Sequence, residues 1–422
     1  MLNRKIAPTL QKIKDYKLPI AKTYTLDNGI KVYEVNEGED EIIKLEIIFH
    51  AGRWHEDKKI ASRATSSLLR EGSKDRNAAV VAEHIDFYGG SIRFPSTLDT
   101  SHIQVYCMTK YLENILPVIS EILENPLLPE KEFRQYIERS EQRLRVDLEK
   151  SDTVAYRQIT EMIYGEQHPY GYNSEPKHFQ ELERGDLVKH YEKNYVSDNC
   201  LIMVSGKTQK NTIPLLNKYL GDSIRRGFST KKDFVINPAK NLNWSFQKED
   251  SLQSAIRIGK QLFDRHHPDY FKFFFLNTIL GGYFGSRLMQ NLREEKGYTY
   301  NIYSTVDAML WDGYFMIGAE VHSEKQEAAL KEIYSELKRL REEKVEEEEL
   351  EMVRNYLLGT LLSAVDGAFN IADVTKTIIL NELPQTYYQD LIQTIKSVTA
   401  DDLQRLAQNH LQQESFYEVI VG

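Results

Sequence analysis

Hydrophobic spacing along the first third of the chain predicts short strands interleaved with helices. An Asn28-Gly29 turn separates two strand-like runs between Thr23 and Val35, and a strongly apolar strand is predicted from Ile42 to His50. The elements predicted next cover residues 59–70 (helix), 78–88 (helix), 91–96 (strand), 102–108 (strand) and a helix from 111 that prolines at 126 and 129 interrupt. This order is typical of a sheet with helices packed against it.

A second pattern, from Ile279 to Ser304, joins a glycine-rich run, a helix and a strand. The paired glycines at its start permit backbone shapes that residues with a Cβ resist. Apolar residues then recur at helical spacing up to Gly297, a glycine at the position where helices commonly end. Beyond that glycine, Tyr298, Tyr300 and Ile302 alternate with other residues, which is strand periodicity.

The order of strands and helices recurs once along the chain. Residues 313–321 have strand periodicity and 324–343 helical periodicity, and the segments 111–133 and 327–350 both consist of a helix, a short break and an acidic start of the next helix. We therefore predict an α+β fold of two tandem homologous domains, each an antiparallel-rich β-sheet with helices packed on one face. The predicted division is an N-terminal domain at 1–220, a linker at 221–243 and a C-terminal domain at 244–422.

Composition limits the class of function. The 422 residues are 41% hydrophobic and 28% charged, as in globular proteins, and the net charge of -9 argues against nucleic acid as a main partner. Cys107 and Cys200 are the two cysteines, each in an apolar run, so buried free thiols and a reducing compartment are expected. The first 21 residues lack the apolar core of a secretory signal and can form a short amphipathic arm. No run of eighteen apolar residues occurs, so we expect a cytoplasmic protein without a membrane partner.

Residue spacing between Ile279 and Ser304 carries a family resemblance. The matching residues are Ser286, Arg287, Leu288, Leu292, Arg293, Glu294, Gly297 and Tyr300. They resemble the signature in the second domain of insulinase-type (pitrilysin-type) zinc peptidases and mitochondrial processing peptidases, and the resemblance extends over about residues 22–420. It implies that Arg293 and Tyr300 reach across a chamber to a zinc site on another domain or subunit, where they hold the substrate peptide and its developing oxyanion. A guanidinium donates several hydrogen bonds in fixed geometry and a phenol donates one more. The alternative is a surface ion pair and a tyrosine packed on a sheet.

The zinc motif that this resemblance implies is missing. Active members carry His-x-x-Glu-His on a helix of the first domain, with two zinc ligands and a general base. In this register the ligand and base positions are occupied by Arg63, Ser66 and Ser67, with Ala64 and Thr65 between them. The third ligand, a glutamate, would fall at residues 144–146, which are Leu, Arg and Val. A cationic side chain in a ligand position repels Zn²⁺, so we predict a chain that binds no metal and has no catalytic residue of its own.

Other candidate groups have simpler interpretations. His50 with His55, and His266 with His267, can in principle bind a metal, but loop histidines are more often solvated. His168 is expected to be structural. Glu346 to Glu349 are expected to form the exposed first turn of a helix, where carboxylates favour the helix dipole.

Three functional hypotheses follow. In the first, the chain is the non-catalytic subunit of a heterodimeric zinc metallopeptidase, forms half of a chamber for unfolded peptides, and supplies Arg293 and Tyr300 to the zinc site of a homologous partner that carries the motif. In the second, it is a non-proteolytic scaffold or peptide-holding subunit of a larger assembly, like the core subunits of the respiratory cytochrome complex. In the third, it is an autonomous peptidase with an unusual metal site. A homodimer in the absence of a partner is compatible with each of them.

Overall fold

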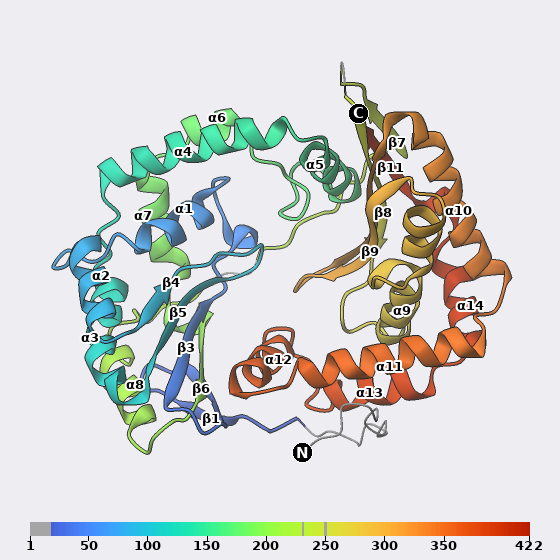
Figure 1. Ribbon diagram of the computed structural model, residues 1–422. Coiled ribbons are helices and arrows are strands. Elements are labelled where there is room, and N and C mark those ends of the chain that lie inside the picture. The colour runs from blue at the N-terminus through green and yellow to red at the C-terminus, as the bar shows by residue number, and fades with distance from the viewer. Residues whose placement is uncertain (1–17, 230–231, 249–250) are drawn as a thin grey trace, which may run out of the picture.

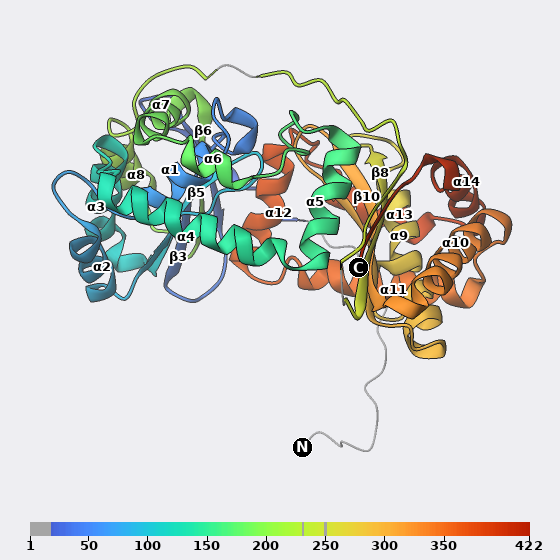
Figure 2. The same cartoon turned by 90° about the horizontal axis from the view of Figure 1, so that it is seen from above.

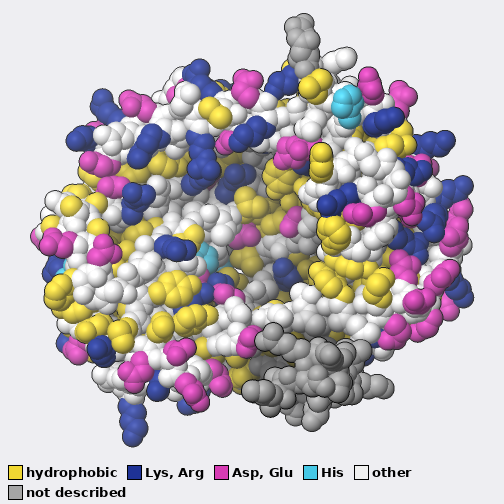
Figure 3. Space-filling view, in the orientation of Figure 1, with side chains coloured by type: hydrophobic (Ala, Val, Ile, Leu, Met, Phe, Trp, Pro, Cys, Tyr) yellow, Lys and Arg dark blue, Asp and Glu magenta, His cyan; other side chains and the backbone are white. Residues whose placement is uncertain are grey.

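The computed structural model describes residues 18–229, 232–248 and 251–422, so most of the predicted N-terminal arm lies outside the described residues. Two lobes face each other around a central opening, one built on an N-terminal sheet and one on a C-terminal sheet (Figure 1). The space-filling view shows a hollow between them (Figure 3).

The N-terminal sheet has six strands within the described part of the chain. Their spatial order is β1 (Lys22–Thr25), β2 (Lys31–Asn36), β6 (Cys200–Gly206), β3 (Ile42–Phe49), β5 (Ser101–Met108) and β4 (Ser91–Arg93). All neighbours are antiparallel except β2 and β6, which are parallel and pair Val32 with Ile202.

The C-terminal sheet repeats this arrangement with five strands in the described ranges. Their order is β7 (Asn243–Phe246), β11 (Tyr417–Val421), β8 (Gln253–Leu262), β10 (Gly313–His322) and β9 (Thr299–Ala308). Its one parallel pair, β7 with β11, corresponds to β2 with β6. The predicted α+β fold with a repeated antiparallel-rich unit is confirmed.

Helices cover each sheet. In chain order they are α1 (Ala61–Leu69), α2 (Ala78–Phe87), α3 (Leu112–Glu124), α4 (Glu130–Leu148), α5 (Ser151–Tyr164), α6 (Pro176–Gln180), α7 (Arg184–Asn194), α8 (Thr212–Leu220), α9 (Tyr270–Asn277), α10 (Gln326–Glu342), α11 (Glu347–Ser363), α12 (Ala368–Leu380), α13 (Tyr387–Ser397) and α14 (Ala400–His410). Two π-helical segments, Thr278–Gly282 and Met289–Glu295, follow α9. Between α8 and β7 the described residues form no helix or strand; the predicted domain limits remain a prediction.

Period-2 alternation assigns the two faces of β3 to different partners. Ile43, Leu45 and Ile47 belong to the core formed with the helices of the N-terminal lobe. Lys44 and Glu46 point to the opposite face, are 4% and 2% exposed, and meet α12. The run that predicted this strand therefore contains two charged residues that are buried in the folded chain.

A helix from each half of the chain lies on the sheet of the other half. α5 packs on β8 and β11, where Ala155 and Ile159 share a core with Val419, and α12 packs on β2 and β6 (Figure 2). Each sheet thus has helices of its own lobe on one face and an exchanged helix on the other. The exchange ties the lobes together, and sequence spacing did not predict it.

Helix length bears on a membrane location. Among the described residues, no single helix is long and apolar enough to cross a membrane. Helices α11 and α12 together have the length and apolar composition of a membrane span, but the chain bends by 106° between them.

Candidate functional site

α1 occupies the place where the zinc motif was expected. Arg63 is exposed on this helix, whereas Ser66 is buried and its hydroxyl donates to the Phe94 carbonyl at 3.0 Å. Ser67 is half-buried. The helix predicted there is present, but its side chains are those of a helix packed against a sheet.

The start of α1 is stabilised by a half-buried carboxylate, that of Glu56. Ile60, which precedes the helix, has a positive φ of 75°, and the Glu56 carboxylate accepts hydrogen bonds from its N–H at 3.1 Å and from the Ser62 N–H at 2.9 Å. The Tyr172 hydroxyl donates to the same carboxylate at 2.5 Å. Burial raises the pKa of Glu56 above its ordinary value, although these donors oppose that effect. This carboxylate caps the helix.

The position expected for the third ligand lies on α4. Carboxylates flank it, but they are engaged in local ion pairs: Glu141 accepts from Arg145 at 2.6 Å, and Asp147 accepts from Lys150 at 2.7 Å. Zinc requires a small set of convergent imidazole, thiolate or carboxylate ligands. The residues on α1 and α4 do not fit that requirement, and the described chain contains no group of three or more His, Cys, Asp and Glu that could hold a metal ion.

The histidines considered as alternative ligands have other surroundings. The rings of His50 and His55 are 6.3 Å apart between centroids, and His55 is 5% exposed with both ring nitrogens lacking a hydrogen-bond partner. Burial, together with the charges of His50 and His190, lowers the pKa of His55 to about 4. His168 is buried and stacks on Tyr164, in agreement with its structural interpretation.

Arg293 lies at the end of the second π-helical segment. Gly297 has a left-handed φ of +62° and ends the helix where the sequence predicted, and the Tyr298 N–H donates to the Leu292 carbonyl at 2.8 Å. This turn brings β9 back beside the helix end. The Arg293 side chain is 32% exposed, and its nearest carboxylate, that of Glu294, is 3.6 Å away.

Tyr300 is placed by a β-bulge. Ala319 pairs with Ile302 and Val321 pairs with Thr299, so two residues of β9 stand opposite Glu320. The Thr299 hydroxyl contributes by donating to the Glu320 carbonyl at 2.6 Å. The strand is present, but Tyr300 and Ile302, expected on the same face of it, differ in environment: Ile302 is 1% exposed and Tyr300 is 89% exposed. The bulge turns the phenol out to solvent.

A bidentate ion pair anchors this segment to α11. The Arg287 guanidinium donates to both oxygens of Glu349, at 2.9 and 2.6 Å. Glu347 and Glu348 lie in the first turn of α11, as predicted for the acidic run, but Glu349 has this additional partner. The pair joins residues 62 positions apart, which no local pattern indicated.

Phe284 is a neighbour of Arg293 that the sequence reasoning missed. The carbon at the centre of the guanidinium is 4.4 Å from the centroid of the Phe284 ring, a cation–π distance. The available signal was an aromatic residue inside a glycine-rich run, nine positions before the arginine.

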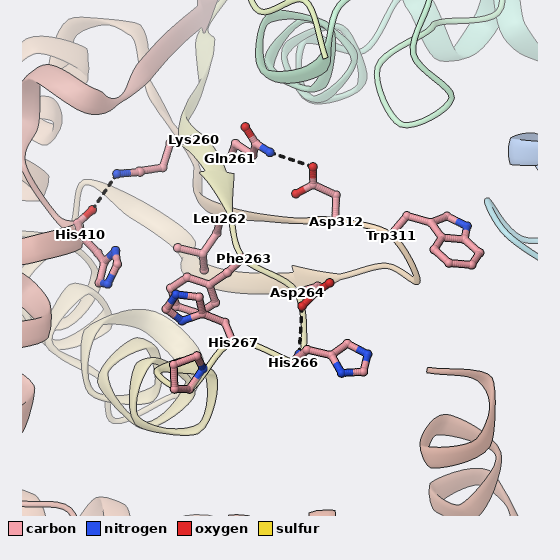
Figure 4. Close-up of a pocket in the computed structure, with 11 residues that line it drawn as sticks. Lys260, Gln261, Leu262, Phe263, Asp264, His266, His267, Trp311, Asp312 and His410 are labelled. Carbon is pink, nitrogen blue, oxygen red and sulfur yellow. Dashed lines mark hydrogen bonds between the residues drawn. The ribbon is translucent and has the colours of Figure 1, made fainter. Parts of the chain in front are cut away.

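A pocket of about 710 Å³ lies at the ends of β8 and β10 (Figure 4). Its polar groups already bond to one another: Asp264 accepts from the His266 N–H at 2.9 Å and Asp312 accepts from Gln261 at 2.7 Å. Burial raises the pKa of Asp312 to about 6. His267 stacks on Phe263, so of the two adjacent histidines only His266 is exposed as expected. Neither Arg293 nor α1 lines this pocket.

Comparison with known proteins finds relatives for this chain. Residues 181–357, which include the whole glycine, helix and strand signature, match the family described as "Peptidase M16 inactive domain". The chain is therefore similar to M16 peptidases over these residues. It is an inactive-type M16 homologue related to peptidase subunits, and the suspected insulinase-type relationship is confirmed.

Relatives and solved structures cover nearly the whole chain. An uncharacterized zinc protease, YmxG of Bacillus subtilis, is 21% identical and aligns over 94% of this chain and 96% of its own. The mitochondrial-processing peptidase subunit beta of Saccharomyces cerevisiae is 21% identical over 96% of this chain and 92% of its own. The crystal structure of a peptidase M16 inactive domain from Pseudomonas fluorescens superposes with a TM-score of 0.87, at 22% identity, over 95% of this chain and 98% of that one. That structural likeness shows a shared fold.

Proposed function

We propose that this chain is the non-catalytic subunit of a heterodimeric zinc metallopeptidase. Its partner is a homologous M16 subunit that carries the zinc motif and the Zn²⁺, and the two enclose a chamber for unfolded peptides. Arg293 and Tyr300 of this chain enter the partner's site and bind the substrate carbonyl as negative charge develops on its oxygen. This chain supplies hydrogen-bond donors, and the partner supplies the metal and the general base.

The observation that carries the proposal is the contrast between α1 and the signature segment that holds Arg293 and Tyr300. α1 keeps its fold but has Arg63, Ser66 and Ser67 at the positions for ligands and base. The signature segment, by contrast, keeps Arg293 and Tyr300, and the β-bulge on β9 leaves Tyr300 89% exposed to solvent. A phenol that is 89% exposed and a guanidinium whose ion pair with Glu294 is 3.6 Å long contribute little to this chain's own stability, so a role toward a second molecule explains them better. A relative named as a peptidase subunit supports a paired arrangement.

The test is reconstitution with the zinc-motif homologue encoded nearest to this chain. Both are purified separately and mixed, and cleavage of fluorescein-labelled β-casein, an unfolded probe, is measured with and without a chelator. We expect chelator-sensitive cleavage by the mixture and none by this chain alone. A chain that forms a stable homo-oligomer, ignores the homologue and cleaves nothing would refute the proposal and favour the scaffold hypothesis.

Substitutions then test the pair. Arg293→Ala should lower kcat by about 10²-fold, the effect of removing one oxyanion donor, and Tyr300→Phe, which removes one hydroxyl, by about 10-fold. Arg405→Ala is a matched control, because Arg405 is a 63% exposed arginine on α14 that pairs with Asp402. Unchanged rates in both variants, with complex assembly intact, would show that the pair has no part in the reaction.

A further inference from the structure

Phe284 lies where it can orient Arg293. The ring centroid is 4.4 Å from the guanidinium carbon, and the phenylalanine side chain remains 60% exposed. A large aromatic residue with that exposure adds little to the core. Its contact with the arginine is therefore the interaction that its position most clearly serves.

The loop that carries Phe284 is held on both sides. A Cβ on Gly281 would lie 2.5 Å from the Ser304 nitrogen of β9, so the backbone approaches that strand more closely than any other residue would allow. On the other side, the Tyr283 ring packs on Tyr356 of α11 with centroids 4.7 Å apart. The position of Phe284 is thus fixed relative to the strand that bears Tyr300 and to α11.

Contact with a ring face leaves the donors of an arginine available. The five N–H groups of a guanidinium lie in its plane, whereas an aromatic ring contacts its face. Arg293 has a long side chain with several rotatable bonds, and an adjacent carboxylate, that of Glu294, competes for it at 3.6 Å. The Phe284 ring, whose centroid lies 4.4 Å from the guanidinium carbon, restricts the orientations of the guanidinium without accepting a conventional hydrogen bond from it.

We propose that Phe284 is a positioning residue for Arg293: its ring holds the guanidinium so that the N–H groups point outward to the bound peptide. This inference rests on the proposed function, since it concerns the same site. Phe284 contacts neither substrate nor metal in this role and acts only through the arginine.

A fluorination series separates electrostatic positioning from packing. Phenylalanine 284 is replaced with its 4-fluoro, 3,5-difluoro and pentafluoro analogues in the full chain, which weakens the negative ring face stepwise with little change in size. In the reconstituted complex with labelled β-casein, we expect kcat to fall stepwise by about two- to five-fold in total, with KM changing less. Phe284→Tyr should retain the rate and Phe284→Ala should lower it. The same analogues at Phe246, a 51% exposed residue of β7, should have no effect.

A second measurement does not depend on a partner. In the isolated chain, the NMR order parameter of the Arg293 Nε–H group should drop in Phe284→Ala and be retained in Phe284→Tyr. A flat kcat along the fluorine series while Arg293→Ala still lowers kcat would overturn the positioning role and leave the proposed function standing. An unchanged order parameter in Phe284→Ala would also overturn it. If Arg293→Ala leaves kcat of the reconstituted complex unchanged, the role proposed for Arg293 in the reaction is refuted, and with it the role of Phe284 in positioning Arg293 for that reaction.

Discussion

Glu46 lies at the centre of a charge network that joins the two lobes, and its removal should loosen them. Its carboxylate accepts from His102 at 2.8 Å, from Gln104 at 2.7 Å and from Lys376 of α12 at 3.0 Å. Lys44, beside it on β3, donates to Asp373 of α12 at 2.8 Å. These contacts connect residues about 330 positions apart in the sequence.

The substitution Glu46→Gln keeps the size of the side chain and removes its charge. Two lysines then share one carboxylate, that of Asp373. The Asp373 side chain is 47% exposed and the Lys44 side chain is 5% exposed. Removing one partner of a buried ion pair leaves an uncompensated charge and costs about 3–5 kcal/mol. That is a large fraction of the stability of an ordinary domain, because domains are stable by only about 5–15 kcal/mol.

The assay is urea unfolding of both forms at several pH values, with hydrogen exchange followed at α12. Asp373→Asn is the control, because this half-exposed partner should cost about 1 kcal/mol or less,. Adding Lys376→Met to Glu46→Gln should cost less than the sum of the two single effects.

The pH dependence has a definite sign. Burial tends to raise the pKa of Glu46, but the hydrogen bond from His102 and the charge of Lys376 outweigh it and hold the pKa well below its usual value. A carboxylate with a lowered folded pKa stabilises fully above its unfolded pKa of about 4.3 and loses that contribution as the pH falls further. The difference between wild type and Glu46→Gln should be constant from neutral pH down to about 5 and shrink below that. A difference under about 1 kcal/mol at pH 7, with unchanged exchange at α12, would refute the reasoning.

Two further predictions concern buried positions near the signature and near α1. Gly281→Ala should destabilise by about 1–3 kcal/mol, because its Cβ would meet the Ser304 nitrogen at 2.5 Å; Gly359→Ala, in an open position on α11, is the control and should be neutral or stabilising in thermal unfolding. His55→Phe should not weaken the protein at pH 7, because no hydrogen bond of the described ring is lost. It should also flatten acid sensitivity between pH 6.5 and about 4, since the lowered pKa of His55 favours its neutral form and protonation opposes folding; equal pH profiles would contradict this.

Local patterns carried much of the fold and part of the candidate site. The Asn28-Gly29 turn, the end of a helix at Gly297 and the strand at 313–321 each depend on neighbouring residues, so sequence reasoning placed them correctly. The residues at the motif positions are likewise readable from the sequence, because neither arginine nor serine replaces an imidazole ligand (Arg63, Ser67) or a glutamate base (Ser66); that the chain binds no metal stays a prediction.

Tertiary structure alone accounts for the rest. Period-2 spacing predicted that Tyr300 and Ile302 share one face of the strand, but a bulge opposite Glu320 on β10 turns the phenol outward, and a bulge depends on the partner strand. Contacts between distant segments place α5 on the C-terminal sheet and α12 on the N-terminal sheet, where α12 covers Glu46. Such contacts form where surfaces complement each other after the chain has folded back, and no periodicity within one segment encodes which distant surface it will meet.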